Sequence, residues 1–326
     1  MTETPLVHIE NLNVEFPLGR KLLGKPPMLK AVNGVSMDIM PGQFYGLVGE
    51  SGSGKTTLGR AILKAVPISS GKILFDDGKV SYDLGTISQT DLKNYRKLAQ
   101  LIFQDPYAAL SPRMTVRDII AEPLEVMGLT QNREETDEKV REIAAKCRLN
   151  LEHLRRFPHA FSGGQRQRIS IARTLVCNPN FVVADESVAA LDVSIQADIL
   201  NLLQSLQDEL GITFLFISHD LSVVAHICDH VAVMYLGTLV ESAPTRKLFD
   251  NPSHPYTKAL LSAIPSLDPD DSGKAQKLEG EIPSPVNPPP GCRFHTRCHL
   301  AEARCRTEIP EWRELSDGHS VACHFA

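Results

Sequence analysis

The fold of this chain is decided at residues 49–57, which read Gly49-Glu50-Ser51-Gly52-Ser53-Gly54-Lys55-Thr56-Thr57. An apolar run, Gln43–Val48, precedes this segment, and a helical pattern follows it. Its glycines allow backbone N–H groups to converge on phosphate oxygens, and the N-terminus of the next helix adds a favourable dipole. Lys55 supplies a positive charge to the outer phosphates, and Thr56 can ligate Mg²⁺. We therefore predict a phosphate-binding loop, with Gly49 and Ser51–Thr57 as the residues that contact the nucleotide.

A second motif of nucleotide-hydrolysing proteins, an apolar run that ends in two acidic residues, is Phe181-Val182-Val183-Ala184-Asp185-Glu186. The apolar residues predict a buried strand, and Asp185 at its end can hold Mg²⁺ through water. Glu186 is placed to orient or deprotonate an attacking water. Many strands end in solvated acidic residues, so this segment alone is a weak indication of a nucleotide site. Together with the phosphate-binding loop it becomes a strong one.

A third segment, Ser162-Gly163-Gly164-Gln165, stands before a predicted helix. Its hydroxyl and backbone donors would lie at a helix N-terminus, where anions bind favourably. The chain therefore carries two candidate phosphate-binding surfaces.

Taken together, these motifs resemble those of ABC-transporter nucleotide-binding subunits. The family's motifs occur in order at Gly49, Gln104, Ser162, Asp185-Glu186, Asp192 and His219, and the likeness covers roughly residues 5 to 265. Two positions depart from the family pattern: Phe161 replaces Leu, and Ser187 replaces Pro. Both lie outside the atoms expected to do the chemistry, so we expect hydrolysis to survive.

The resemblance implies that two subunits pair head to tail. ATP with Mg²⁺ on the P-loop of one subunit would be covered by residues 162–165 of the other. Gln104 would reach the metal and the water and signal to membrane subunits, while His219 would contact the γ-phosphate and align Glu186. Asp192 would lie at the dimer seam. Phe16 is positioned like the aromatic residue that stacks on adenine, although in an alternating strand it is equally a core residue.

Three segments are similar to the dipeptide and oligopeptide importers: Phe103–Met114, His254–Pro265 and the tail that begins at Gly291-Cys292. Residues 191–197 resemble the second ATPase of the heteromeric pair. The resemblance implies a homologous ATPase partner, two membrane permease subunits and, indirectly, an extracytoplasmic solute-binding protein. Nickel complexes, glutathione or another small solute remain alternative cargoes. A soluble, non-transport ABC ATPase is a different class, disfavoured because the chain has one cassette and no heptads.

The tail carries four cysteines, Cys292, Cys298, Cys305 and Cys323. Four thiolates suit a [4Fe–4S] cluster or tetrahedral Zn²⁺, and free or buried thiols are the other interpretation. The resemblance to peptide-importer ATPases implies the iron–sulfur cluster. We therefore expect a metal site with a structural role in this tail.

Composition limits the remaining possibilities. The 326 residues are 42% hydrophobic and 22% charged, with a formal net charge of −5, which does not favour nucleic acid as a partner. No apolar run approaches the roughly 20 residues that span a membrane, and the N-terminus lacks a secretory pattern. We expect a protein peripheral to the cytoplasmic face of a bacterial inner membrane.

Strands that alternate with helices predict an α/β fold with a mainly parallel sheet. With the resemblance, we expect a P-loop ABC ATPase core, an antiparallel β subdomain, an inserted helical subdomain at about residues 106–177 and a small Cys-rich C-terminal extension. The expected domains are residues 1–244, the ATPase, and residues 245–326, the extension. A polar segment, Asp268–Lys277, would connect flexibly to the tail.

Overall fold

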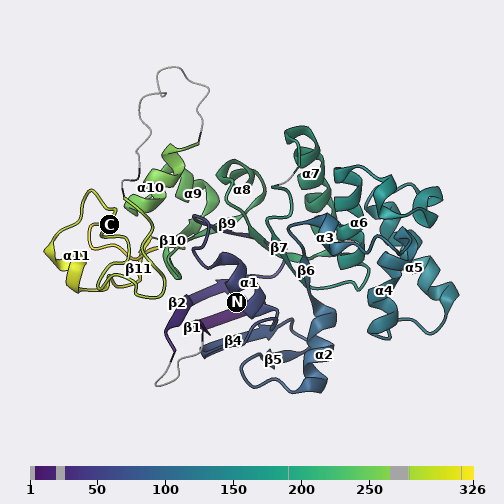
Figure 1. Cartoon of the computed structure of the whole chain (residues 1–326), viewed down its shortest axis with the longest axis horizontal. Coiled ribbons are helices and arrows are strands. Elements are labelled where there is room, and N and C mark those ends of the chain that lie inside the picture. Colours follow the sequence, from purple (N-terminus) through teal and green to yellow (C-terminus); the bar gives the residue numbers. More distant parts are fainter. Residues whose placement is uncertain (1–3, 20–25, 190, 265–277, 279, 317) are drawn as a thin grey trace.

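The computed structural model contains two sheets joined by helices (Figure 1). It describes residues 4–19, 26–189, 191–264, 278, 280–316 and 318–326. The predicted connector Asp268–Lys277 lies outside these residues. The larger sheet has the strand order β11-β12-β10-β9-β3-β8-β7-β6, and the smaller one has the order β2-β1-β4-β5.

The centre of the larger sheet is parallel, as the sequence predicts. Its five parallel strands are β3 (Phe44–Val48), β6 (Ala99–Ile102), β7 (Phe181–Asp185), β8 (Thr213–Ile217) and β9 (His230–Tyr235). Every residue of β3, β7 and β8 is buried, which explains their continuous apolar runs: both faces of a parallel sheet are covered. Because the strands run the same way, their carboxyl ends meet at one edge.

The smaller sheet is antiparallel and is formed by β1 (Val7–Pro17), β2 (Met28–Ile39), β4 (Ser70–Asp76) and β5 (Ser81–Asp83). The second half of β2 alternates buried and exposed residues, as in a strand with one face packed on a core. Helix α2 (Gln89–Leu98) packs here through Tyr95, whose ring meets that of Phe75 edge-on at 5.2 Å. This sheet shares a buried core with α1 (Lys55–Ile62) and with residues of the larger sheet, among them Leu47, Val183 and Leu215.

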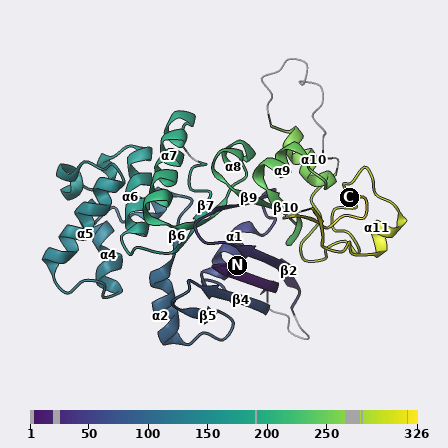
Figure 2. The same ribbon diagram turned by 180° about the vertical axis from the view of Figure 1, so that it is seen from behind.

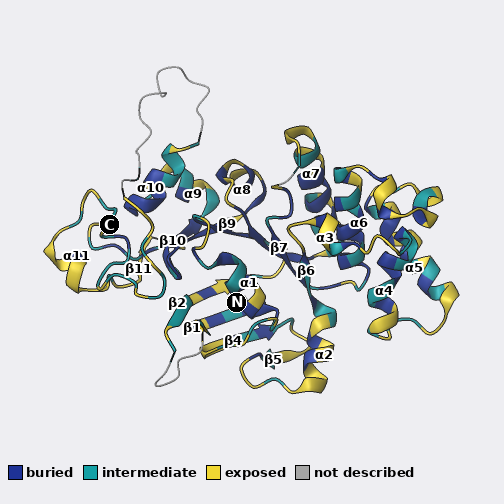
Figure 3. Cartoon of the chain, viewed as in Figure 1, coloured by how far each residue is buried: buried dark blue, intermediate teal, exposed yellow. Residues whose placement is uncertain are grey.

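The helical subdomain forms one end of the molecule (Figures 1 and 2). It consists of α3 (Pro106–Ala109), α4 (Val116–Val126), α5 (Arg133–Lys146), two short 3-10 helices, η1 (Leu151–Arg155) and η2 (Pro158–Ala160), and α6 (Gly163–Leu175). Thr115, Asn132 and Ser162 cap α4, α5 and α6 with their side chains. The inner face of α5, which includes Val140 and Ile143, is buried, whereas its outer face is exposed (Figure 3).

Four further helices complete the part around the larger sheet: α7 (Val193–Leu210), α8 (Leu221–Ile227), α9 (Thr245–Asp250) and α10 (Pro255–Ser262). Residues 280–326, here called the C-terminal module, form the opposite end of the molecule. The module contains α11 (Ala303–Thr307), β11 (Arg313–Ser316) and β12 (His319–Val321). β12 pairs with β10 (Thr238–Pro244), so the module extends the ATPase sheet.

Packing of aromatic side chains joins the module to the rest of the chain. Phe294 lies 5.2 Å from the ring of Tyr235 on β9 and 5.3 Å from that of Tyr256 on α10. A buried hydrogen bond adds to this contact, because His319 Nε2 lies 2.8 Å from an oxygen of Glu241 on β10. The module is therefore anchored by an apolar cluster and by a buried polar contact.

The predicted metal site in the module is wrong. Cys292, Cys298, Cys305 and Cys323 are free thiols, and within the described ranges no group of three or more His, Cys, Asp or Glu side chains could hold a metal ion. Burial raises the pKa of Cys292 to about 11 and also raises that of Cys298. The structure therefore supports neither the iron–sulfur cluster nor zinc, and the aromatic cluster supplies the module's anchor.

The packing of Phe294 in this cluster leads to a prediction about the stability of the protein. Replacing Phe294, which is 2% exposed, by Ala should lower the free energy of unfolding by about 3–5 kcal/mol, because it leaves a cavity between the module, β9 and α10. Urea denaturation of the full-length chain measures this loss. Phe325→Ala is the matched control, since Phe325 is 39% exposed and should cost less than about 1 kcal/mol. Equal losses in the two variants would contradict the anchoring role.

Candidate nucleotide site

The loop between β3 and α1 requires glycine at two positions. Gly49 has φ 148° and Gly54 has φ 106°, backbone conformations that residues with a side chain rarely adopt. A Cβ at Gly49 would lie 2.1 Å from the carbonyl oxygen of Met234, and one at Gly54 would lie 2.2 Å from that of Ala31. The loop is thus pressed against β9 and β2, which fixes its path into the N-terminus of α1.

Lys55 is buried within this loop. Its ammonium donates hydrogen bonds to the carbonyl oxygens of Gly49, at 2.7 Å, and Glu50, at 2.9 Å. Burial lowers the pKa of Lys55, while the nearby carboxylates of Glu186 and Asp185 act in the opposite direction. The charge is therefore held inside the concave face of the loop, where phosphate oxygens would gather.

Thr56 and Asp185 come together from different strands. The hydroxyl of Thr56, at the start of α1, donates to Oδ1 of Asp185 at the end of β7, at 2.9 Å. Burial raises the pKa of Asp185, and this hydrogen bond partly offsets the shift. A hydroxyl and a carboxylate fit Mg²⁺, which prefers oxygen donors and takes few protein ligands when nucleotide phosphates and waters supply the others.

Glu186 stands next to this pair, and its carboxylate is contacted from two sides. Gln104 Nε2 donates to Oε2 at 2.7 Å, and Nδ1 of His219 lies 3.4 Å from Oε1. The backbone of Glu186 has φ 47°, the left-handed region that non-glycine residues rarely occupy. Its N–H donates to the carbonyl of Ile217 at the end of β8, which holds this conformation. The three predicted catalytic side chains therefore converge.

The convergence follows from the sheet. The P-loop follows β3, Gln104 follows β6, Asp185 ends β7 with Glu186 directly after it, and His219 follows β8. The carboxyl ends of parallel strands lie at one edge, so segments far apart in sequence meet there. Ser187 lies directly after this group and is buried, and its hydroxyl has no hydrogen-bond partner among the described residues.

The signature residues begin α6. Ser162 and Gln165 form a reciprocal capping box, in which each side chain accepts a hydrogen bond from the other residue's backbone N–H. Gly164 is required by packing, because a Cβ there would lie 2.5 Å from Ile195 on α7. Gly163, Ser162 and Gln165 are not buried, and among the described residues no hydrogen bond joins them to the chain's own P-loop. The start of α6 is therefore accessible at Ser162 and Gln165, which are exposed.

Two further predicted residues lie away from these contacts. Phe16 is half-buried near the end of β1, where it packs against the core of the smaller sheet and pairs in register with Leu29. Asp192 is exposed immediately before α7 and makes no side-chain cap. Phe16 therefore contributes to the core, and its contact with adenine stays a prediction, as does the place of Asp192 at a dimer seam.

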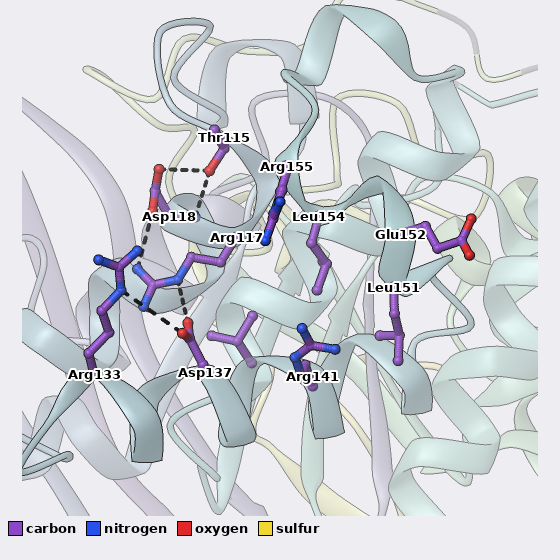
Figure 4. Close-up of a pocket in the computed structure, with 11 residues that line it drawn as sticks. Thr115, Arg117, Asp118, Arg133, Asp137, Arg141, Leu151, Glu152, Leu154 and Arg155 are labelled. Carbon is purple, nitrogen blue, oxygen red and sulfur yellow. Dashed lines mark hydrogen bonds and ion pairs between the residues drawn. The ribbon is translucent and has the colours of Figure 1, made fainter.

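A cavity of about 570 Å³ lies elsewhere, between α4, α5 and η1 (Figure 4). Its central residue, Arg117, donates to Asp137 at 2.7 Å and to Asp118 at 3.1 Å. The pair with Asp137 joins α4 to α5, whereas the pair with Asp118 lies within α4. The cavity contains no phosphate-binding loop, so it is not a second candidate for the nucleotide.

Two contacts to Glu50 were not predicted. Its backbone N–H donates to the hydroxyl of Tyr256 at 2.8 Å, and its carboxylate accepts two hydrogen bonds from Arg297. The partners are 206 and 247 residues away. No local sequence pattern predicts the contacts of Glu50 with Tyr256 and Arg297, because the folding of the larger sheet and of the module brings these residues together.

Comparison with protein families gives two matches. Residues 32–189 match the ABC transporter family, and residues 240–305 match the family described as oligopeptide/dipeptide transporter, C-terminal region. The first match contains the P-loop, Gln104, the signature and Asp185-Glu186. The second contains α10 and much of the C-terminal module.

The solved structure of the dimeric ATP-binding cassette MJ0796, bound to ADP and phosphate, superposes with a TM-score of 0.64 and 25% identity, and covers 74% of this chain and 99% of that one. The oligopeptide transport ATP-binding protein AppF of Bacillus subtilis is 47% identical over 324 residues, 98% of this chain and 97% of AppF. The dipeptide transport ATP-binding protein DppF of Haemophilus influenzae is 46% identical over 320 residues, 98% of this chain and 96% of DppF. The chain therefore belongs to the ATP-binding proteins of the oligopeptide and dipeptide ABC transporters.

Proposed function

We propose that this chain binds and hydrolyses ATP to energise a di- or oligopeptide importer. The observation that carries the proposal is the convergence of Lys55, Thr56, Asp185 and Glu186 at one sheet edge. Family membership supports the coupling of this hydrolysis to transport.

The geometry supports a role for each group. The N–H groups of residues 49–57 and the ammonium of Lys55 would bind the β- and γ-phosphates, which replace the loop carbonyls as partners of that ammonium. Glu186 would accept a proton from the attacking water, and Gln104 and His219, which contact its two oxygens, would orient it. Mg²⁺, held by Thr56 and Asp185, would neutralise charge that develops on the phosphates.

The signature at the start of α6 supports pairing with a second ATPase. Its exposed capping box lies at a helix N-terminus, which is suited to the phosphates of a nucleotide on another subunit. The relative MJ0796 is dimeric in its solved structure. We propose a homologous, non-identical partner, with this chain as the second ATPase of the pair.

The loop after β6 is our candidate contact with the membrane permeases. Tyr107 on α3 is 64% exposed, and the guanidinium of Arg166 on α6 lies 3.9 Å from its ring centroid. This contact joins the loop after Gln104 to the helix that carries the signature. A permease that presses on Tyr107 would thereby act on both halves of a composite ATP site.

Among the described residues, no helix is long and apolar enough to cross a bilayer. We propose that two permease subunits hold the chain at the cytoplasmic face of the membrane, and that a solute-binding protein delivers the cargo on the other face. We also propose that the ATPase domain spans residues 1–244 and the extension residues 245–326, because β10 ends at Pro244 and α9 begins there.

Uptake by proteoliposomes tests the cargo. Vesicles that hold this chain, its partner ATPase and the two permeases, supplied with the solute-binding protein, should import a labelled tripeptide only with internal ATP. Unlabelled peptides should compete, whereas a nickel chelate and glutathione should not. Competition by either of these, without competition by peptides, would assign the transporter to that solute instead.

Replacement of the proposed base gives a second prediction. Glu186→Gln should lower the ATPase rate of the assembled transporter by about 10²–10⁴-fold, the usual contribution of a general base, because an amide cannot accept the water's proton. ATP affinity should be retained, as measured by calorimetry. Glu138→Gln, an exposed carboxylate of α5 that serves as the control, should leave turnover unchanged. A Glu186→Gln transporter with the unaltered rate would contradict the assignment of the base.

A further inference from the structure

Glu50, the second residue of the P-loop, makes hydrogen bonds through its backbone N–H, its backbone carbonyl and its side-chain carboxylate. Its carbonyl accepts hydrogen bonds from the Lys55 ammonium and, at 3.2 Å, from the Ser53 N–H. Its own N–H donates to the Tyr256 hydroxyl, and its carboxylate accepts from Arg297. The contacts from Lys55 and Ser53 belong to the loop, whereas those from Tyr256 and Arg297 come from beyond the ATPase core.

Arg297 and the carboxylate of Glu50 form a bidentate ion pair with two hydrogen bonds. Nη1 lies 2.6 Å from Oε2, and Nη2 lies 3.0 Å from Oε1. The arginine side chain is 6% exposed and that of Glu50 is 24% exposed, so water screens this pair little. Paired, charge-assisted hydrogen bonds of this kind are stronger and more directional than neutral ones.

The guanidinium is held in place by its surroundings. Its carbon lies 5.9 Å from the centroid of the Tyr235 ring on β9. Phe294, three residues before Arg297, packs between Tyr235 and Tyr256. The cluster that anchors the C-terminal module therefore also presents Arg297 to the P-loop, and Tyr256 in the same cluster accepts the hydrogen bond from Glu50.

The charge of Glu50 acts on the phosphate site. Its carboxylate influences Lys55, together with Asp185 and Glu186, and all of these are negative charges close to a loop that must receive a polyanion. Asp185 has a task with Mg²⁺ and Glu186 has one with water. Glu50 has no such task, so an unpaired carboxylate there would only repel the phosphates.

We propose that Arg297 of the C-terminal module is a positioning residue for the nucleotide: by neutralising Glu50 it prevents an unpaired carboxylate from repelling the phosphates. The inference rests on the proposed ATP-binding function. It gives the module a direct task at the ATP site, from the opposite end of the molecule to the helical subdomain (Figure 2).

A charge-swap series tests this role in the purified full-length chain. Calorimetry with Mg²⁺ and the non-hydrolysable analogue AMP-PNP gives the Kd. Arg297→Gln should raise the Kd about five- to tenfold, the effect of one unpaired charge near the phosphates. The double variant Glu50→Gln/Arg297→Gln should return the Kd to within about twofold of the unaltered value, because neither charge remains.

The matched control is Arg304→Gln, in the same module, where the guanidinium contacts the His324 carbonyl and the Phe325 ring. Its Kd should not change. An unchanged Kd in Arg297→Gln would overturn the proposal. A Kd that stays raised in the double variant would do so too, since a merely structural contact is not rescued by removing Glu50.

A further variant covers the case in which Arg297→Gln does not fold. Glu50→Gln alone leaves Arg297 positive beside the phosphates, so AMP-PNP should bind as tightly as to the unaltered chain or more tightly. Weaker binding would contradict neutralisation. Failure of the unaltered chain to bind AMP-PNP is a separate result, which would overturn the proposed function itself.

Discussion

The hydrogen bond from the Thr56 hydroxyl to the Asp185 carboxylate joins two segments that are 129 residues apart in the chain. It exists because β3 and β7 run parallel on either side of β8, so that the loop after β3 and the acidic end of β7 open at the same edge. The same constraint brings Gln104 and His219 to the two oxygens of Glu186. Buried apolar strands therefore do more than form a core: their common direction assembles the site.

Much of this edge could be predicted from the sequence, since Phe181–Ala184 is an apolar run and residues 49–57 carry a complete loop pattern. The roles of Gln104 and His219 rested on resemblance, because neither residue has a local signature of its own. The prediction of a metal site in the cysteine tail was wrong. The sequence shows that four thiols occur in a short segment, but it does not show how they are arranged in space. The strands β11 and β12 were missed because they are short, and every residue of β11 is exposed, which removes the alternation that marks a strand.

The two ends of the molecule stand in different relations to the nucleotide. The helical subdomain presents an exposed helix N-terminus, and among the described residues its capping box makes no hydrogen bond to its own P-loop. Such an N-terminus would have a role if a second subunit contributed the nucleotide. The C-terminal module instead acts within its own chain, through Tyr256 beside it and through Arg297. One end would thus complete the partner's site, while the other would set the geometry of this one.

The most direct test of the account is whether the edge formed by Thr56 and Asp185 is a metal–nucleotide site. Electron paramagnetic resonance with Mn²⁺ in place of Mg²⁺ counts the metal bound to the full-length chain. The account predicts about one tightly bound Mn²⁺ per chain when AMP-PNP is present, and a large loss of that signal in Asp185→Asn, because an amide is a far weaker ligand for a hard cation. Nucleotide-dependent Mn²⁺ binding that is equally tight in Asp185→Asn would contradict it.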